Sequence, residues 1–423
     1  MSRYILSYLI ILLAVEGVAA VNEPMIAKVA SGTATVAMAS WWGFDPADST
    51  SALQAAINSG AKKLIVNNVG KPWVVRPISL ASNQEIIFEK GVEVIAKRGE
   101  FKGKNDCLFR ADRKQNVSLV GYGAIVRMHR SDYARAPYEK AEWRHVLSFK
   151  SCSNIKVKGL TLAESGGDGI YLGTAKAGIT NKSILIKDVV CDKNYRQGIS
   201  VITAEDLLIE NTIMRNTDGT PPQDGIDFEP NEAGERLVNV VMRNCTTLGN
   251  SGDGYALYLI PLDASSKPVS IRIENCKSLR ENSAGVRIVT GNGPKKAVKG
   301  KIEFVNCSFQ DDIDPGVIIS SVPVGGCRVR FVNCSILDAA AKEPTAAPIM
   351  FQSRRDATEP IGGVEFVNCT IRDSHRRNPI VYQDRAGGVP VRAVTGTLNS
   401  YRQGKKQTIK ITPELLAKWV EGR

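Results

Sequence analysis

The chain contains few of the residues on which several common kinds of site depend. It has only three histidines in 423 residues, and His129, His145 and His375 all lie outside its densest acidic segments. We therefore expect neither a His-based metal site nor a Ser-His-Asp triad, since both need a histidine within the site. The segment "TGNGPKK", which begins at Thr290, lacks the spacing and the following helix of a phosphate-binding loop.

Long apolar runs are also missing after the N-terminus, which argues against a membrane span in the mature chain. The first residues combine Arg3, an apolar stretch over residues 4–15 and small residues at 18–20. This layout is typical of a signal peptide over residues 1–20, cleaved after Ala20, and predicts a secreted or periplasmic protein. The formal net charge of +12 then favours an anionic partner, for which acidic polysaccharide is a better candidate than nucleic acid.

Cysteine is present but does not form a disulfide pattern. There are nine cysteines, an odd number, and five of them recur at one position of an internal repeat. A linear file of thiols lacks the convergence that a metal site needs. We therefore predict free cysteines that serve as small buried hydrophobic residues.

Two short phrases alternate along most of the chain. One is a strand that ends in Asn-Cys or a relative, as in "SIRIENCKS" and "KIEFVNCSF". The other is a short strand opened by Gly or Pro, as in "DGIDF" and "AGVRI". The openers, 27 to 32 residues apart, are Gly169, Gly198, Gly225, Gly254, Gly285, Gly316, Pro348 and Pro379. Repeats of this length bury a continuous core only when they stack on one another.

This pattern predicts an all-β fold, a right-handed parallel β-helix over residues 25–384. "DSTSALQAAINSG" is expected to form an N-terminal capping helix, and residues 385–423 a C-terminal extension with a short helix begun by Thr412 and Pro413. Asn residues of the first phrase should stack at a turn, with the cysteines in a file beside them. We expect a single domain and a monomer.

Aligning the coils on their openers predicts which side chains face outward. Two positions after the openers stand Tyr171, Ser200, Asp227, Ala256, Arg287, Ile318, Met350 and Val381. Immediately before the openers stand Asp168, Gln197, Asp224, Asp253, Ala284, Pro315, Ala347 and Asn378. The polar residues gather in the coils from Gly169 to Gly285, so we expect a functional groove there.

The predicted catalytic residues of this groove are Asp224, Asp227, Glu229 and Asp253. Asp227 and Glu229 should face outward about 7 Å apart along one strand, and Asp224 and Asp253 should lie about 4.8 Å apart on neighbouring coils. Clustered carboxylates raise one another's pKa, which suits a general acid. Pairs about 5 to 9.5 Å apart are the apparatus of glycoside hydrolysis.

Other residues of the same coils are candidates for binding substrate. Arg196 and Arg287 could hold a carboxylate or a sulfate group. Aromatic rings that could stack on sugars, together with an acid before an opener, complete the set: Tyr171, Tyr195, Tyr258 and Asp168.

Several alternatives remain open at this point. Asp224, Asp227 and Glu229 could instead bind Ca²⁺, in which case Arg287 would act in a lyase or epimerase on uronates. Without that metal, no cofactor is expected. An Asp before Gly is often only a turn residue, and an acidic strand face is often only solvated. The third possibility is therefore a β-helix that binds carbohydrate without catalysis.

The segment from about Trp42 to Asp384 resembles the pectate-lyase-like superfamily of right-handed β-helix proteins. Within it, "PQDGIDFEP", "SGDGYALY" and "AGVRIVT" are similar to the ordered motifs of polygalacturonase-type glycoside hydrolases. The resemblance implies that Asp224 and Asp253 are the acids of the first two motifs and that Arg287 is a substrate-binding arginine. The chain departs from the family where Gly254 replaces a second Asp, where Val289 replaces a Lys, and where no Gly-His-Gly motif occurs.

These observations predict an exported enzyme that hydrolyses glycosidic bonds in an acidic polysaccharide, either uronate-rich or sulfated.

Overall fold

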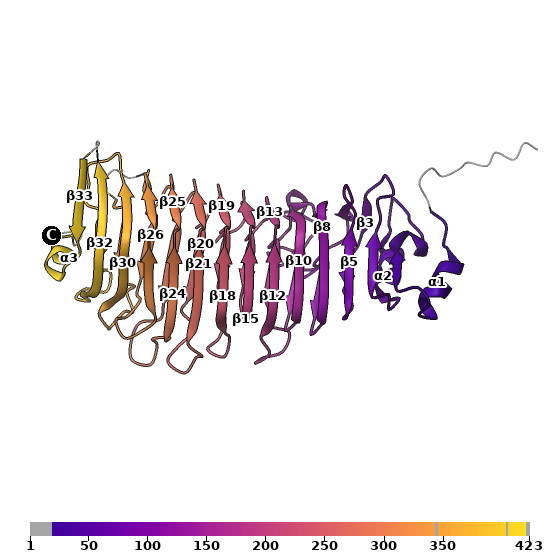
Figure 1. Ribbon diagram of the computed structural model, residues 1–423, viewed down its shortest axis with the longest axis horizontal. Coiled ribbons are helices and arrows are strands. Elements are labelled where there is room, and N and C mark those ends of the chain that lie inside the picture. Colours follow the sequence, from indigo (N-terminus) through magenta and orange to yellow (C-terminus); the bar gives the residue numbers. More distant parts are fainter. Residues whose placement is uncertain (1–18, 343–345, 403–404, 420–423) are drawn as a thin grey trace, which may run out of the picture.

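The protein is an elongated stack of β-coils along one axis (Figure 1). The computed structural model describes residues 19–342, 346–402 and 405–419. The predicted signal peptide lies almost wholly outside the described residues. Neighbouring coils pair through parallel strands, and the predicted right-handed parallel β-helix is confirmed.

Within the described residues the strands form two sheets. The eleven-stranded sheet contains β4 (Ile78–Ser79), β7 (Phe109–Asp112), β9 (Leu147–Lys150), β11 (Ile170–Gly173), β14 (Ile199–Val201), β17 (Ile226–Phe228), β20 (Tyr255–Leu259), β23 (Val286–Thr290), β26 (Val317–Ser320), β29 (Ile349–Gln352) and β31 (Ile380–Gln383). These are the strands of the Gly- or Pro-opened phrase and its N-terminal continuation.

The second sheet has 22 strands and wraps the remaining sides of the coils. It contains β1 (Val36–Met38), β2 (Lys63–Val66), β3 (Trp73–Val75), β5 (Gln84–Phe88), β6 (Glu93–Ala96), β8 (Gln115–Arg127), β10 (Ser153–Ala163), β12 (Asn181–Lys187), β13 (Val190–Asp192), β15 (Ala204–Glu210), β16 (Ile213–Arg215), β18 (Leu237–Arg243), β19 (Thr246–Leu248), β21 (Val269–Glu274), β22 (Lys277–Leu279), β24 (Gly300–Val305), β25 (Ser308–Gln310), β27 (Arg328–Val332), β28 (Ser335–Leu337), β30 (Ile361–Arg372), β32 (Val391–Arg402) and β33 (Lys405–Lys410).

The Asn-Cys phrase forms a corner between a long and a short strand of this second sheet. Asn306 has φ 55°, a left-handed conformation that Asn tolerates better than most residues. Its side-chain amide donates to Asn275 Oδ1 (3.1 Å), and the amide of Asn333 donates to Asn306 Oδ1 (3.2 Å). The predicted Asn stack is thus confirmed, with the amides bonding between coils.

The core is a set of files that run along the axis. Phe304, Phe331 and Phe366 stack with ring centroids 5.0 and 5.2 Å apart. All nine cysteines are buried and free, as predicted. The opener glycines are explained by close packing between coils, since a Cβ on Gly198 would lie 2.3 Å from the carbonyl oxygen of Gly225.

Helices close the two ends of the stack (Figure 1). The expected N-terminal capping helix is α2 (Thr50–Asn58), which buries Leu53, Ala56 and Ile57 and follows α1 (Glu23–Ala30) and the 3₁₀ helix η1 (Ala39–Trp42). At the other end α3 (Pro413–Lys418) begins after Thr412, whose hydroxyl accepts from the N–H of Leu415 (3.3 Å).

The stack also continues further than the repeat in the sequence indicates. β32 pairs in parallel with β30, and β33 then pairs antiparallel with β32. Regular strand pairing therefore runs past Asp384 to Lys410. No helix among the described residues is long and apolar enough to cross a membrane.

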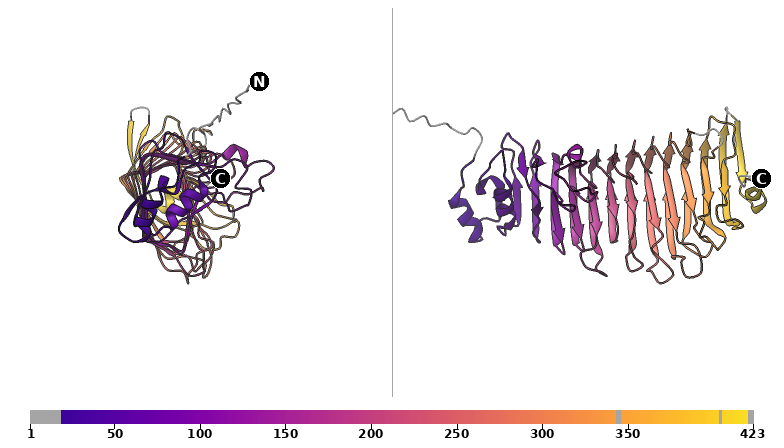
Figure 2. Two further views of the ribbon diagram at one scale, coloured as in Figure 1. Left: turned by 90° about the vertical axis from the view of Figure 1, so that its right-hand side faces the viewer. Right: turned by 180° about the vertical axis from the view of Figure 1, so that it is seen from behind.

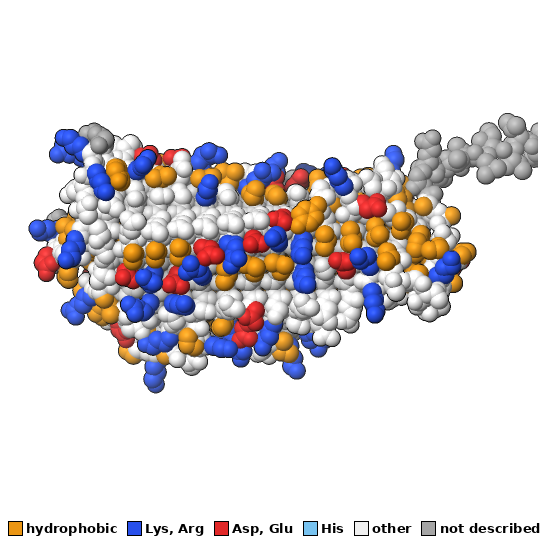
Figure 3. Space-filling view, viewed as in Figure 1, with side chains coloured by type: hydrophobic (Ala, Val, Ile, Leu, Met, Phe, Trp, Pro, Cys, Tyr) orange, Lys and Arg blue, Asp and Glu red, His pale blue; other side chains and the backbone are white. Residues whose placement is uncertain are grey.

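Much of the surface charge is paired between coils. Lys, Arg, Asp and Glu side chains form a row along the long axis of the visible face (Figure 3). Pairs of this kind on the 22-stranded sheet include Arg243–Glu274 (3.3 Å) and Arg330–Glu303 (3.5 Å). Part of the charge on this face therefore links neighbouring coils and does not mark a binding patch.

Candidate functional site

The outward file of the eleven-stranded sheet has the register that the sequence predicts. Tyr171 pairs with Ser200, Ser200 with Asp227, Asp227 with Ala256, and Ala256 with Arg287. Arg287 is therefore two coils from Asp227. The apolar residues that flank Asp227, Ile226 and Phe228, point into the core and are fully buried.

The residues before the openers form a ladder of hydrogen-bond acceptors. The backbone N–H of Asp168 donates to His145 Nδ1 (3.0 Å), that of Asp224 to Gln197 Oε1 (2.7 Å), and that of Asp253 to Asp224 Oδ1 (2.6 Å). The N–H of Ala284 donates in turn to Asp253 Oδ1 (2.9 Å). These side chains thus have a structural role in holding successive coils together.

Asp224 and Asp227 are far more buried than the sequence suggests. Asp227, expected on an open strand face, is 0% exposed, and Asp224 is 1% exposed. Gln197 links them, because its Nε2 donates to Asp227 Oδ2 (2.6 Å) while its Oε1 accepts from the backbone of Asp224. Each carboxyl group nevertheless keeps one oxygen, Asp224 Oδ2 and Asp227 Oδ1, without a hydrogen-bond partner among the described residues.

Burial is also the main cause of the pKa shifts of Asp224 and Asp227. It raises the pKa of both Asp224 and Asp227 well above the usual value for Asp. The charges of Asp253 and Asp227 raise the pKa of Asp224 further. The Arg196 guanidinium opposes the effect of burial at Asp227. An arginine thus opposes burial at each of the two carboxyl groups, Arg287 at Asp224 and Arg196 at Asp227.

Asp253 forms an ion pair with Arg287. Arg287 Nε donates to Asp253 Oδ2 (2.6 Å) and its Nη2 to Asp253 Oδ1 (3.0 Å), a two-point contact. The Tyr258 hydroxyl donates to the same carboxylate (3.3 Å). Burial disfavours the charged guanidinium, but Asp253, with smaller effects from Tyr258 and Asp314, raises the pKa of Arg287 above its ordinary value. Arg287 is thus held as a cation, with Asp253 as its counter-ion.

Arg196 and Glu229 form the outer part of the cluster. Arg196 Nη2 donates to Glu229 Oε2 (3.0 Å), and its Nε lies 3.7 Å from Glu142 Oε1. The Glu229 side chain is 36% exposed, so it borders solvent where Asp227 does not. Burial acts against the charge on Arg196, yet Asp168, Asp227 and Glu229 together raise its pKa above the ordinary value.

The segment between β8 and β9 supplies a wall beside the cluster. It contains the 3₁₀ helix η2 (Arg130–Asp132) and stands out from the coils in the end-on view (Figure 2). Arg144 anchors it, since its side chain is fully buried and donates to the carbonyl oxygens of Phe101 (2.8 Å) and Lys102 (3.2 Å). Glu142 of this segment reaches Arg196.

His145 was expected outside the cluster, and that expectation is wrong. Its ring stacks on Tyr171 with centroids 4.5 Å apart, and its Nδ1 lies 3.1 Å from Asp168 Oδ2. Lys150 lies 5.6 Å from the Tyr171 ring centroid. The repeat carries the missed signal: Val146 pairs one coil before Gly169, so His145 occupies the position before the opener that Asp168 and Asp224 also occupy.

Asp168 and the tyrosines differ in how freely they could meet a sugar. Asp168 is fully buried, and its carboxylate makes no hydrogen bond among the described residues beyond the 3.1 Å approach of His145 Nδ1 to Oδ2. Tyr171 has its ring packed against His145, which leaves it less free to stack on a sugar than the sequence predicts. Tyr195 packs over the backbone of Gly219, where a Cβ would lie 2.1 Å from its ring.

The arrangement does not fit a calcium site. Among the described residues no three His, Cys, Asp or Glu side chains converge as metal ligands would. The carboxylate of Asp253 is held by Arg287, and that of Glu229 is paired with Arg196. A calcium ion needs six to eight oxygen ligands, and cations already hold these two carboxylates.

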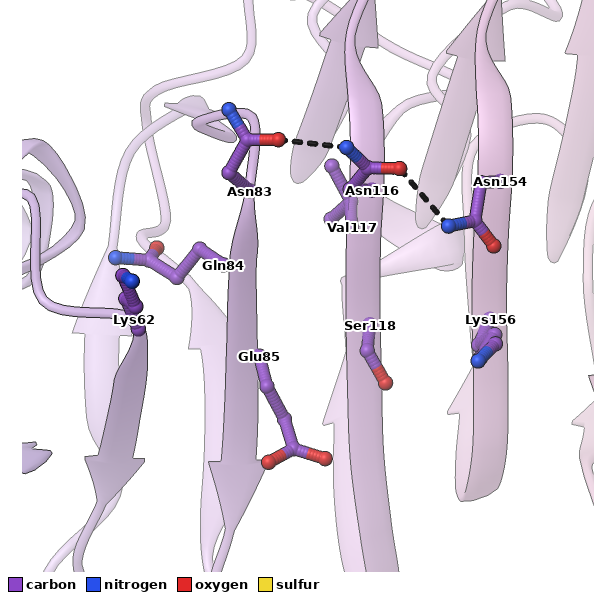
Figure 4. Close-up of a pocket in the computed structure, with 9 residues that line it drawn as sticks. All are labelled: Lys62, Asn83, Gln84, Glu85, Asn116, Val117, Ser118, Asn154 and Lys156. Carbon is purple, nitrogen blue, oxygen red and sulfur yellow. Dashed lines mark hydrogen bonds between the residues drawn. The ribbon is translucent and has the colours of Figure 1, made fainter.

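A hollow of about 400 Å³ lies away from the carboxylates, on the 22-stranded sheet (Figure 4). It is lined by Asn83, Asn116 and Asn154, and their amides already bond to one another at 2.6 and 2.8 Å. Lys62 and Lys156 border it. It is a depression over a structural amide ladder, on a different sheet from the carboxylates.

Comparisons with known proteins agree with the fold. The family model described as "Right handed beta helix region" matches residues 145–339. The uncharacterized protein YclG of Bacillus subtilis is 29% identical over an alignment of 157 residues, and the match covers 34% of this chain. That match spans 26% of the length of YclG, about a quarter of the relative.

Solved structures extend the likeness over most of the chain. The A-module of mannuronan C-5 epimerase AlgE4 from Azotobacter vinelandii has a TM-score of 0.64 at 14% identity, covering 86% of this chain and 95% of that one. The exopolygalacturonase of Thermotoga maritima has a TM-score of 0.51 at 12% identity, covering 86% and 90%. PfbA, a surface adhesin of Streptococcus pneumoniae, has a TM-score of 0.60 at 12% identity, covering 87% and 91%. This protein is therefore a right-handed parallel β-helix protein, with a fold shared by hydrolases, epimerases and adhesins.

Proposed function

We propose that the protein hydrolyses glycosidic bonds in an acidic polysaccharide. The observation that carries the proposal is the buried pair Asp224 and Asp227, joined through Gln197, with raised pKa values and one uncommitted oxygen on each carboxyl group. A general acid near neutral pH needs a raised pKa, and two carboxyl groups are the usual apparatus of this reaction. The polygalacturonase fold likeness is consistent with such a substrate.

We assign different roles to the two carboxyl groups according to their charged neighbours. Asp224 lies beside two other aspartates, so it keeps its proton and would donate it to the oxygen of the leaving sugar. Asp227, where Arg196 opposes the effect of burial, would accept a proton from the attacking water. Arg196 and Arg287 would hold acidic groups of the substrate beside the scissile bond.

The lyase and epimerase alternative has less support from the side chains. A lyase base must lose its proton, and Asp253 holds Arg287 in its charged form. A carbohydrate-binding protein without activity is the second candidate. The burial of Asp224 and Asp227 favours it, because a buried carboxyl group reaches substrate only if neighbouring side chains such as Glu229 and Arg196 move.

The N-terminal residues support a further part of the proposal, which is that the enzyme works outside the cytoplasm. Arg3, the apolar stretch over 4–15 and the small residues before Val21 are consistent with an export signal. Polymeric acidic substrates would meet an exported enzyme there.

A screen on pectic, alginate and sulfated algal polysaccharides tests the proposed chemistry. Each polymer is incubated with and without chelator, and new reducing ends, absorbance from unsaturated uronates and uronate stereochemistry by NMR are recorded. Hydrolysis predicts reducing ends without absorbance, at a rate indifferent to chelator. Absorbance that disappears with chelator would instead establish a metal-assisted lyase, and unchanged polymer length with altered uronate stereochemistry would establish an epimerase.

A further inference from the structure

A hollow of about 210 Å³ lies on the same sheet face as the carboxylate pair, immediately beyond Arg287. Ile318 of β26 and Met350 of β29 line it, and they follow Arg287 in the same outward file. Gln352, Gln383 and Arg385 also line it. The hollow therefore continues the line that begins at Asp227 toward the C-terminal coils.

The register fixes how far this hollow is from the proposed reaction centre. Ile318 lies three coils from Asp227 and Met350 lies four, which corresponds to about 14 and 19 Å at a strand spacing of about 4.8 Å. Arg287 stands between the two places. A ligand that reaches both must be a chain, and it must run along the axis of the coils.

The charged residues of the lining favour an acidic sugar, since Lys342 and Arg385 accompany Arg287, and the carboxylate of Asp314 lies 3.9 Å from Arg287 Nη2. Met350 supplies an apolar surface for a ring face beside the buried Ile318, and Gln352 and Gln383 supply amides for hydroxyl groups. Arg385 supplies charge: its Nη2 donates to Gln383 Oε1 (3.0 Å), and no described carboxylate lies within 4.0 Å of its guanidinium. By contrast, nearby Arg354 is paired with Asp356 (3.1 Å).

We propose that this hollow, the Arg385 subsite, binds an acidic sugar unit of the same polymer three to four coils from the Asp224–Asp227 pair. The unit lies against Met350, and Arg385 pairs with its carboxylate or sulfate group. The subsite presupposes the proposed function in one respect, because the polymer is taken to reach both places. It makes the protein selective for long chains over short ones.

The test compares Arg385→Gln with Arg328→Gln in a protein that also carries Asp224→Asn, so that oligomers are not cleaved during the measurement. Arg328 is an exposed arginine of β27 on the other sheet and loses the same charge. Binding of digalacturonate, hexagalacturonate and hexamannuronate is measured by calorimetry. Loss of a charge-assisted contact predicts that Arg385→Gln weakens binding of one of the hexamers about tenfold or more. Binding of the dimer is expected to change less than twofold, and Arg328→Gln to change neither.

A second readout keeps the outcomes apart. In the otherwise native enzyme, Arg385→Gln should raise KM for the polymer and leave kcat within about twofold, because the contact is far from the reacting bond. Hexamer affinity that is unchanged by Arg385→Gln would overturn the subsite while the hydrolase stands. Hexamer binding that depends on Arg385 without any turnover would support the subsite and overturn the hydrolase. Equal weakening by both arginine substitutions would show only general charge attraction and would overturn the subsite.

Discussion

At the residue scale, burial sets the chemistry of the carboxyl groups in this protein. Asp227 shows this most clearly, since its place in the outward file follows from strand alternation but its complete burial does not. Gln197 of the preceding coil bonds to Asp227, and Arg196 of that coil links Glu229 to Glu142 of the segment before β9. No local pattern in "DGIDF" encodes that cover. His145 differs in this respect, because its position before an opener follows from the repeat once its coil is aligned with the later ones.

Asp312, a buried carboxyl group outside the proposed site, offers a test of this electrostatic account. Burial raises its pKa from 3.8 to about 8. Between about pH 4 and pH 8 the unfolded chain loses this proton and the folded chain keeps it. The free energy of unfolding therefore falls as pH rises, by up to about 1.4 kcal/mol per pH unit.

Asp312→Asn should remove part of that pH dependence. The wild type is expected to melt at a lower temperature at pH 8 than at pH 5, and the variant should show a smaller difference. Thermal unfolding followed by circular dichroism measures this, with exposed Asp311→Asn as the matched control. A variant whose melting temperature still depends on pH as in the wild type would contradict the burial account.

At the scale of the element, the corner between long and short strands determines how one coil fits the next. The Asn stack could be predicted from the sequence because Asn recurs at the same place in successive repeats. Each of these repeats forms the same corner, so its Asn residues line up between coils. The loops of the groove differ from coil to coil, so their positions could not be predicted in this way. That is why the register of the candidate site followed from the sequence while its enclosure did not.

Asn306 tests the role of this corner. Asn306→Ala should destabilise the protein by about 2 kcal/mol. The variant loses the exposed side-chain hydrogen bonds to Asn275 and Asn333, and it places Ala in a left-handed backbone conformation. Asn306→Gly should cost about half as much, since Gly adopts φ 55° without a Cβ clash. Chemical denaturation gives both values. If Gly is no better tolerated than Ala, backbone conformation is not what the corner selects.

At the scale of the whole molecule, a stack of open coils must be closed at its ends. The last coil is covered by β33 and α3, and Leu416 of that helix is buried. The backbone N–H of Tyr382 donates to the carbonyl oxygen of Trp419 (3.0 Å), which fixes the helix to β31. An uncovered end would present strand edges and apolar surface to other molecules.

Leu416→Ala should therefore loosen the cap and promote association. Light scattering after size-exclusion chromatography is expected to show larger species for this variant, with increased binding of a dye for apolar surface. Glu414→Ala, on an exposed position of the same helix, should behave as the wild type. Equal behaviour of the two variants would mean that α3 does not protect the end of the stack.

The central claim is that Asp224 and Asp227 carry out the proton transfers of a hydrolysis, and their neutral variants test it most directly. On the polymer that the wild type cleaves, the release of reducing ends is measured for Asp224→Asn and Asp227→Asn, with melting temperature as a check on folding. Loss of general acid or base catalysis predicts a fall in kcat of about 10²- to 10⁴-fold for each variant, with polymer binding retained. Folded variants that cleave the polymer within a few-fold of the wild-type rate would contradict the account.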